Sequence, residues 1–235
     1  VADFAARFPF PFTAGQKAAV RAVFENLRAP TRMNRLLQGD VGSGKTAVAL
    51  AGIFMAVRSG HQAAFLAPTE VLAAQNFALV QRYLPEYPAA FLAGSTPAAE
   101  KRAIKKAFAS GEVSVLCGTH AVLQGDVSAK DLAFCVCDEQ HRFGVAQRSA
   151  LGEKSAGADM LVMSATPIPR TLSLIFYGDL DITEIKDKPA ERAPVVTGIV
   201  PSRKYDDMLA YIGQEAEKGN QSYFVCPKIE GDEEG

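Results

Sequence analysis

A glycine-rich turn lies between an apolar run and a helix-like run in residues 36–50, LLQGDVGSGKTAVAL. The phosphate-binding pattern G-x-x-x-x-G-K-[ST] is matched from Gly39 to Thr46, with the strand before it and the helix after it that the pattern requires. Glycines let backbone N–H groups face phosphate oxygens, and a helix start adds a positive dipole end. Lys45 is expected to reach the β- and γ-phosphates, and the Thr46 hydroxyl to coordinate Mg²⁺. The predicted nucleotide-binding loop comprises Gly39, Asp40, Val41, Gly42, Ser43, Gly44, Lys45 and Thr46.

A pair of acids follows a second apolar run, in FCVCDEQH at 134–141. Asp138 is placed to hold Mg²⁺ at the carboxyl edge of a sheet, where open α/β folds bind their ligands. Glu139 is expected to polarise the attacking water as a general base. His141 lacks a histidine or cysteine partner at metal-ligand spacing, so a hydrogen bond beside the γ-phosphate fits it better than zinc. Together with the glycine-rich loop, these residues predict an NTPase.

Upstream, FPFPFTAGQ contains Phe10, Thr13 and Gln16. One interpretation is a capping box, in which Thr13 is the N-cap of a helix and Gln16 is its third residue. The other is adenine recognition, because a glutamine amide can both donate to and accept from the N6/N7 edge. Both interpretations can hold at once, so all three residues are candidates for the nucleotide site.

These residues need a scaffold, and strand-like and helix-like runs alternate along the chain. Strands are expected at 34–38, 63–68, 89–93, 113–119, 132–139 and 160–166, and helices within 44–60, 70–84 and 97–111. Pro97 suits a first helical position, and Gly111 suits a helix stop. Nearly continuous apolar strands are typical of a parallel sheet buried on both faces. The fold is therefore predicted to be α/β, with a mostly parallel, doubly wound sheet.

A charged, proline-bearing connector, DKPAERAP, occupies residues 187–194. After it, VVTGIV, a helix-like run and SYFVCPKI predict a β-α-β unit that stops after its second strand. We therefore expect an ATP-binding domain over 1–190, and a linker with the start of a second domain over 191–235. The chain has no initial methionine and ends abruptly, so it is expected to be a piece of a longer protein.

The composition has 48% hydrophobic residues and a net charge of −1, so any nucleic-acid contact must come from local patches. The four cysteines form no C-x-x-C pair, which favours buried, reduced thiols in a cytosolic protein. No apolar run approaches the roughly 18 residues that a membrane span needs. The expected location is therefore cytoplasmic.

The motifs in order, namely an aromatic-Thr-x-x-Gln element, GDVGSGKT, APTEVLAAQ, GTHAV, DEQH and SATPIPR, resemble those of superfamily 2 helicases. Longer words such as DEQHRFGVAQR and SATPIPRTLSLIFYGDLDI resemble the RecG-type bacterial ATP-dependent DNA helicases, from about Phe8 to Glu230. The resemblance implies a RecA-like motor domain that uses ATP and Mg²⁺. Ser164 departs from the more usual threonine of T-A-T but keeps its hydroxyl.

The transcription-repair coupling factors share the GTH, RFGV and TPIPR words and are an alternative. They usually carry D-E-E-H where this chain has DEQH, and G-Y-G-K-T where it has G-S-G-K-T. Both differences favour the RecG type. Two further alternatives stay open, a P-loop kinase or metabolic NTPase, and a nucleotide-controlled DNA-binding module that never moves.

The resemblance also implies roles for residues outside the nucleotide loop. Gln140 and His141 would report the γ-phosphate to the SAT motif, which links ATP state to DNA grip. Simple loop capping remains an alternative for the Thr and Ser hydroxyls among the residues below. A solvated loop remains an alternative for those in HRFGVAQR, at 141–148. The residues implied in DNA binding or coupling are Pro68, Thr69, Glu70, Gly94, Ser95, Gly118, Thr119, His120, Arg142, Phe143, Arg148, Ser164, Ala165, Thr166 and Arg170.

The whole protein implied by this resemblance acts on branched DNA, in fork regression and Holliday junction processing during repair and recombination. It would be a bacterial monomer, with a wedge domain before this chain and a second RecA-like domain that brings an arginine finger. On this view the chain alone holds ATP but barely hydrolyses it.

Overall fold

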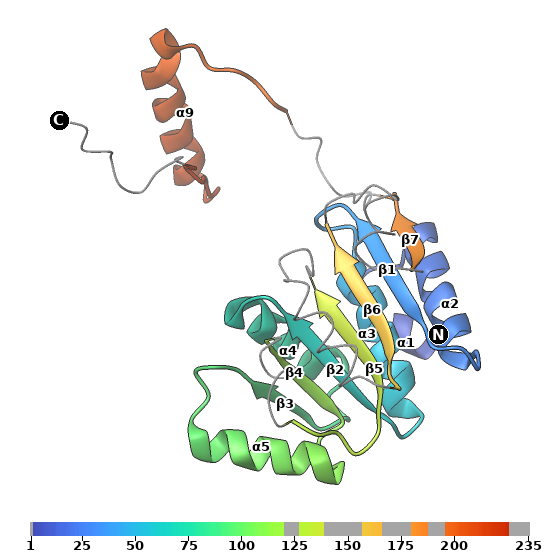
Figure 1. Cartoon of the computed structure of the whole chain (residues 1–235). Helices are drawn as coiled ribbons and strands as arrows, with labels where there is room; N and C mark the ends of the chain where they lie inside the picture. Colours follow the sequence, from blue (N-terminus) through green and yellow to red (C-terminus); the bar gives the residue numbers. More distant parts are fainter. Residues whose placement is uncertain (1, 120–126, 139–156, 166–179, 188–195, 226–235) are drawn as a thin grey trace, which may run out of the picture. The chain divides into compact units, whose positions relative to one another are not determined.

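The computed structural model describes residues 2–119, 127–138, 157–165, 180–187 and 196–225 (Figure 1). The chain divides into two compact units, Val1–Glu191 and Arg192–Gly235. The first unit holds the sheet with its covering helices, and the second holds α9 (Tyr205–Glu217) after a short 3₁₀ turn, Ser202–Lys204. The assignment of the second unit to a second RecA-like domain stays a prediction.

Seven strands form the sheet of the first unit in the order β3-β4-β2-β5-β6-β1-β7. All six neighbouring pairs are parallel. The predicted α/β fold with a parallel sheet is therefore confirmed. The strands are β1 Asn34–Gly39, β2 Gln62–Ala67, β3 Ala89–Leu92, β4 Val115–Thr119, β5 Leu132–Asp138, β6 Asp159–Ser164 and β7 Asp181–Ile185. Among the described residues of this unit, the helices are α1 Ala2–Ala5, α2 Ala14–Arg28, α3 Lys45–Arg58, α4 Glu70–Tyr83 and α5 Ala98–Ser110.

The helices cover both faces of the sheet. Side chains of α2, α3 and α4 share one core cluster with Phe65 and Phe134. On the opposite face, Phe108 of α5 packs with Leu92 and Leu116. All six residues of β2 are buried, as expected for a central strand covered on both faces. The sheet is thus doubly wound, and its core lies on both of its sides.

One edge strand was not predicted from the sequence. β7 carries charged residues, and only Ile185 among its five residues is buried. Polar, short edge strands lack the apolar run that reveals central strands, and their charges discourage edge-to-edge pairing. The missed strand lies directly beside β1, with Gly39 opposite Ile185.

In the second unit the predicted helix is present as α9, but the two predicted strands are absent among its described residues 196–225. Val196 and Ile199 are almost fully exposed there. A strand is defined by ladder hydrogen bonds to a neighbour, and the described part of this unit contains no sheet to supply them. The prediction of strands at 195–200 and 222–229 was therefore wrong for the described residues.

Helix ends follow local signals. Gly111 ends α5, as predicted, and it does so in the left-handed conformation at φ 87°. Pro97 is the N-cap of α5, one position earlier than expected, because the helix begins at Ala98. Such a shift lies within the usual uncertainty of helix boundaries.

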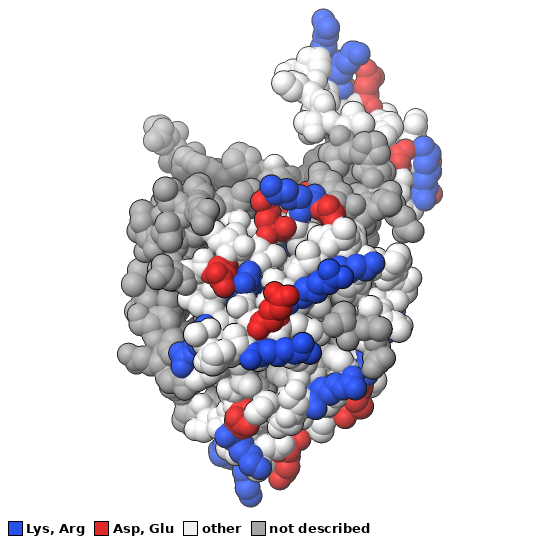
Figure 2. Space-filling view, turned by 90° about the vertical axis from the view of Figure 1, so that its right-hand side faces the viewer, with Lys and Arg blue, Asp and Glu red and all other residues white. Residues whose placement is uncertain are grey.

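Charged residues of both signs mix on the face that carries α2 and β7 (Figure 2). Lys17, Arg21 and Glu25 are exposed on α2, and Asp181 and Glu184 on β7. This face therefore matches the near-zero net charge and is not a uniformly basic surface.

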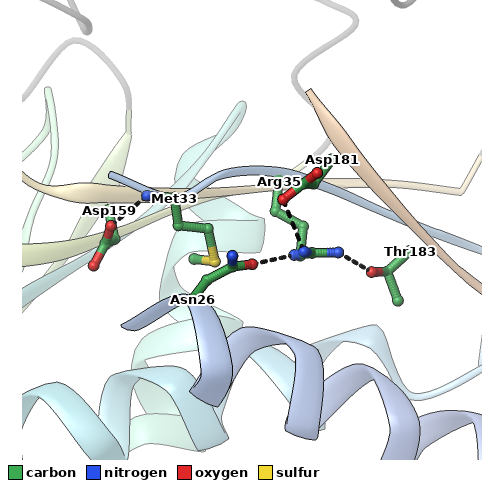
Figure 3. Close-up of polar contacts among 6 residues, drawn as sticks. All are labelled: Asn26, Met33, Arg35, Asp159, Asp181 and Thr183. Carbon is green, nitrogen blue, oxygen red and sulfur yellow. Dashed lines mark hydrogen bonds and ion pairs between the residues drawn. The ribbon is translucent and has the colours of Figure 1, made fainter. Parts of the chain in front are cut away.

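Arg35 holds the edge strand to its neighbours (Figure 3). Its guanidinium donates to Asn26 Oδ1 of α2 at 2.8 Å and to Thr183 Oγ1 of β7 at 2.5 Å. A further ion pair joins it to Asp181 at 2.9 Å, and the Arg35 side chain is only 11% exposed. Beside this group, Asp159 accepts from the Met33 amide at 2.6 Å, and burial raises the pKa of Asp159. The contacts of Arg35 with Thr183 and Asp181 fasten β7 at the end of β1 opposite to the glycine-rich loop.

We predict that Arg35→Ala lowers the free energy of unfolding by about 2–3 kcal/mol, because it leaves several partners of a nearly buried charge unsatisfied. The Asp181 carboxylate is 61% exposed, so Asp181→Ala as the control should cost less than about 1 kcal/mol. Urea unfolding of both variants measures the difference. Equal losses for the two variants would contradict this account.

Candidate nucleotide site and nucleic-acid edge

The glycine-rich loop joins the end of β1 to the start of α3. Gly42 and Gly44 have φ of 77° and 86°, a left-handed conformation that side chains disfavour. Ser43 N donates to Asp40 O at 3.1 Å, which closes a turn in the loop. Gly39, the last residue of β1, has no room for a side chain, because a Cβ there would lie 2.5 Å from Ser43 Oγ. The glycines of the motif are therefore required by this local geometry.

The loop has the donors that a phosphate needs. Gly44, the N-cap of α3, provides no side-chain cap to the first-turn amides. Lys45 Nζ lies over the loop and donates to Gly39 O at 2.6 Å and Asp40 O at 3.0 Å. An ammonium group beside a helix N-terminus fits an anion. The next residue, Thr46, is half-buried in the first turn of α3.

Gln16 connects this loop to α2. The capping box is present, with Gln16 N donating to Thr13 Oγ1 at 3.2 Å and Thr13 N to Gln16 Oε1 at 2.9 Å. The Gln16 amide also donates to Ser43 O at 2.8 Å, and a Cβ on Gly44 would collide with it. Nearby, Phe10 is 46% exposed. The capping interpretation is confirmed, and adenine recognition by Phe10, Thr13 and Gln16 stays a prediction.

Asp138 ends β5 at the same sheet edge as the loop. The strands are ordered β5-β6-β1, with Asp138 opposite Met163 and Ser164 opposite Gln38. Parallel strands bring their carboxyl ends together, so Gly39, Ser164 and Asp138 follow one another along this edge. Carboxylate and hydroxyl oxygens suit Mg²⁺, so Asp138 and Thr46 are chemically fitted to it.

Several predicted residues lie outside the described residues, so the structure places none of them. Glu139, Gln140 and His141 follow Asp138 directly in the sequence, and Thr166 follows the described Ala165. The others in this group are His120, Arg142, Phe143, Arg148 and Arg170.

The remaining predicted DNA-contact residues lie on the other half of the same edge. β3, β4 and β2 are adjacent there, with Leu92 opposite Gly118 and Ala67 opposite Thr119. The loop after β2 carries Pro68 and Thr69 and leads into α4 at Glu70, and the loop after β3 carries Gly94 and Ser95. The structure thus brings the three predicted backbone-contact segments together, next to the nucleotide half.

The Glu70 carboxylate connects the segment that follows β2 to the loop that follows β3. It accepts from Ser95 N at 3.0 Å and from Ser95 Oγ at 2.5 Å. The hydrogen bond from the Ser95 hydroxyl is the main cause that lowers the pKa of Glu70. Thr69 Oγ1 accepts from Leu72 N and caps α4, and Lys101 Nζ donates to Gly94 O at 2.6 Å. Capping is confirmed for Thr69, and the Ser95 hydroxyl donates to Glu70 instead, while contact with a nucleic-acid backbone stays a prediction.

One residue beside this site belongs to no predicted motif. Asp187 Oδ2 accepts from Gly15 N, in the first turn of α2, at 2.6 Å. The two residues are 172 positions apart, so no local pattern in the sequence indicates the contact.

Comparison with known proteins gives this geometry a family. The sequence model of the DEAD/DEAH box helicases matches residues 13–175, which contain the loop, Asp138 and the candidate DNA-contact segments. The chain belongs to the DEAD/DEAH box helicase family. It is also 44% identical to the ATP-dependent DNA helicase RecG of Streptococcus pneumoniae over 96% of this chain, and 42% identical to that of Staphylococcus epidermidis over 99%.

The solved structure of RecG bound to a three-way DNA junction matches 97% of this helicase-family chain, with a TM-score of 0.83 and 38% identity. The predicted RecG-type resemblance and RecA-like fold are confirmed. The chain covers 34% of those curated relatives and 31% of that solved chain, so it spans about a third of their length. In the part of this chain that the structure describes, no helix is long and apolar enough to cross a membrane.

We predict that Gln16→Glu weakens nucleotide binding by about fivefold, since the carboxylate can still cap α2 but cannot donate to Ser43 O, and one such hydrogen bond contributes about 1 kcal/mol. Gln16→Ala should lose both contacts and also lower the free energy of unfolding. Titration with a fluorescent ATP analogue and urea unfolding separate the two effects. Gln81→Glu on the exposed face of α4 is the matched control. Unchanged affinity in Gln16→Glu would mean that the Ser43 contact is unimportant.

Proposed function

We propose that this chain is the ATP-binding motor domain of a DNA helicase or translocase that acts on branched DNA. The observation that carries the proposal is the likeness, over nearly the whole chain, to a RecG structure bound to a three-way DNA junction. The arrangement of the sheet edge supports it, because nucleotide loop and candidate DNA loops lie on adjacent halves of one edge. Fork regression and Holliday junction processing are the reactions that such a motor would perform.

The nucleotide would be ATP, held by the loop from Gly39 to Thr46. Lys45 would leave the carbonyls of Gly39 and Asp40 to bind the β- and γ-phosphates, which offer a full negative charge. Thr46 and Asp138 would hold Mg²⁺, which would neutralise charge on the phosphates when bound. Glu139 would orient and deprotonate the attacking water, and Gln140 and His141 would report the γ-phosphate to the segment Ser164–Thr166.

DNA would be held by the other half of the edge. Backbone N–H groups and hydroxyls at loop tips are common phosphate ligands and carry no sequence preference. The Glu70–Ser95 contact would keep the segments that follow β2 and β3 at a constant separation while the DNA strand moves past them. Contacts through neutral groups also agree with the net charge of −1.

The complete protein would contain a second RecA-like domain, of which residues 191–235 would be the start, and a wedge domain before this chain. Opening and closing of the cleft between the two motor domains would move DNA in one direction. Because its relatives are bacterial DNA helicases, the protein would act as a monomer in the bacterial cytoplasm.

We predict that ATP hydrolysis by the full-length protein is stimulated more by a three-way junction than by linear duplex of equal length. Lys45→Ala should reduce the stimulated rate by at least about 10³-fold, because charge stabilisation at the phosphates carries much of phosphoryl-transfer catalysis. Phosphate release measures both. An ATP hydrolysis rate that does not change when DNA is added would favour a metabolic NTPase. A rate that DNA stimulates, without displacement of a triplex strand, would favour a DNA-binding module that does not move.

We also predict that residues 1–235 alone bind ATP but hydrolyse it slowly. An arginine finger supplied by another domain contributes on the order of 10³–10⁵ in rate in related phosphoryl-transfer systems. Equilibrium binding and single-turnover hydrolysis of the isolated chain measure the two properties. Turnover equal to that of the full-length protein would contradict the proposed need for a second domain.

A further inference from the structure

The segment that follows β7 begins beside the nucleotide loop. β7 pairs with β1 so that Ile185 lies opposite Gly39, the first residue of the loop. The contact is close, since a Cβ on Gly39 would be 3.2 Å from Ile185 O, and Ile185 is only 2% exposed. Two residues later comes Asp187, the last described residue before position 188. The route from the first unit to Arg192 therefore starts at the phosphate end of the sheet.

Asp187 binds the first turn of α2. Its Oδ2 accepts from Gly15 N at 2.6 Å, and Asp187 is half-buried. Gly15 is the second residue of α2, so its amide is one of those that the helix itself leaves without a partner. A carboxylate at this position also interacts favourably with the helix dipole. Gly15 suits the contact because a Cβ there would approach Asp187 Oδ2 to 2.9 Å.

The next residue of the same turn reaches the nucleotide loop. Gln16 is 2% exposed and donates to Ser43 O at 2.8 Å. The side-chain Oε1 of Gln16 accepts from Thr13 N, which limits rotation of the side-chain amide. Asp187, the first turn of α2 and the Ser43 carbonyl are thus joined by consecutive hydrogen bonds through one short, capped piece of helix.

We infer that Asp187 is a positioning residue for the nucleotide loop, which it links through Gly15 and Gln16 to the segment that leads into the second unit. The carboxylate fixes the first turn of α2, and that turn fixes Ser43. A displacement of the segment after β7 then alters the loop that holds phosphate, and nucleotide binding acts on the segment in return. The expected effect of Asp187 on nucleotide affinity rests on the proposed function of the loop. Its expected effect on the order of the loop without nucleotide does not depend on that function.

The experiment compares Asp187→Ala, Asp187→Asn and Glu184→Ala in the full-length protein. Glu184→Ala is the matched control because it removes an equal charge three residues away, from a carboxylate that pairs with the exposed Lys186 at 3.3 Å. Amide hydrogen exchange of residues 36–46 is measured without nucleotide, and affinity is measured with a fluorescent ATP analogue. Asp187→Ala should speed exchange in the loop and weaken affinity by about 5- to 10-fold, within the usual range of coupling between sites. Asp187→Asn keeps an acceptor and should recover most of both, and Glu184→Ala should change neither.

Gly15→Ala separates this role from helix stability. Alanine favours the helix over glycine by about 1 kcal/mol, yet its Cβ would displace the Asp187 carboxylate. The positioning role predicts faster loop exchange and weaker affinity in Gly15→Ala, but no further change when it is added to Asp187→Ala. A purely structural role predicts equal or slower exchange in Gly15→Ala.

Loop exchange and affinity that stay unchanged in Asp187→Ala would overturn the inference, even if urea unfolding showed lower stability. Additive effects of Gly15→Ala and Asp187→Ala would also overturn it. Failure of the proposed function gives a different result. Lys45→Ala would then leave ATP-analogue binding intact, whereas loop exchange would still respond to Asp187→Ala.

Discussion

The parallel arrangement of the strands is the constraint on which the rest of this structure depends. Each crossover returns the chain to the side of the sheet where the strands begin. The carboxyl ends of all the strands therefore lie together along the opposite side, which is the edge that carries the site. The glycine-rich loop, Asp138, Ser164 and the carboxyl ends of β2, β3 and β4 all meet there because of this one rule. An antiparallel sheet of the same strands would scatter them over both edges.

The strand order then divides that edge by chemistry. β5, β6 and β1 carry the nucleotide residues, whereas β3, β4 and β2 carry the candidate DNA-contact residues. β2 and β5 are hydrogen-bonded neighbours, so the two halves share one rigid sheet. A motor that converts phosphate chemistry into movement along DNA needs such a rigid connection between its two sites.

Polar side chains, rather than apolar ones, hold the loops at this edge in place. The Gln16 side-chain amide donates to Ser43 O of the nucleotide loop. The Glu70 carboxylate, which follows β2, accepts from Ser95 in the loop after β3. Each makes two side-chain hydrogen bonds to protein groups, as buried or half-buried polar groups generally do. Asp187 extends the same kind of support to the segment beyond β7.

The sequence alone determined whatever depends on neighbouring residues and on the periodicity of apolar positions. The loop from Gly39 to Thr46, the capping box of Thr13 and Gln16, the helix stop at Gly111 and the strands β1 to β6 were predicted, because each is specified within a few positions. Tertiary structure decided what depends on contacts between distant segments. β7 is a strand only because β1 and Arg35 hold it, and Gln16 reaches Ser43 only because α2 packs beside the loop. Asp187 meets Gly15 across 172 positions, a contact that no local pattern contains. Hydrogen bonds of this kind form between surfaces that the folded sheet creates, so they become visible only once the sheet is assembled.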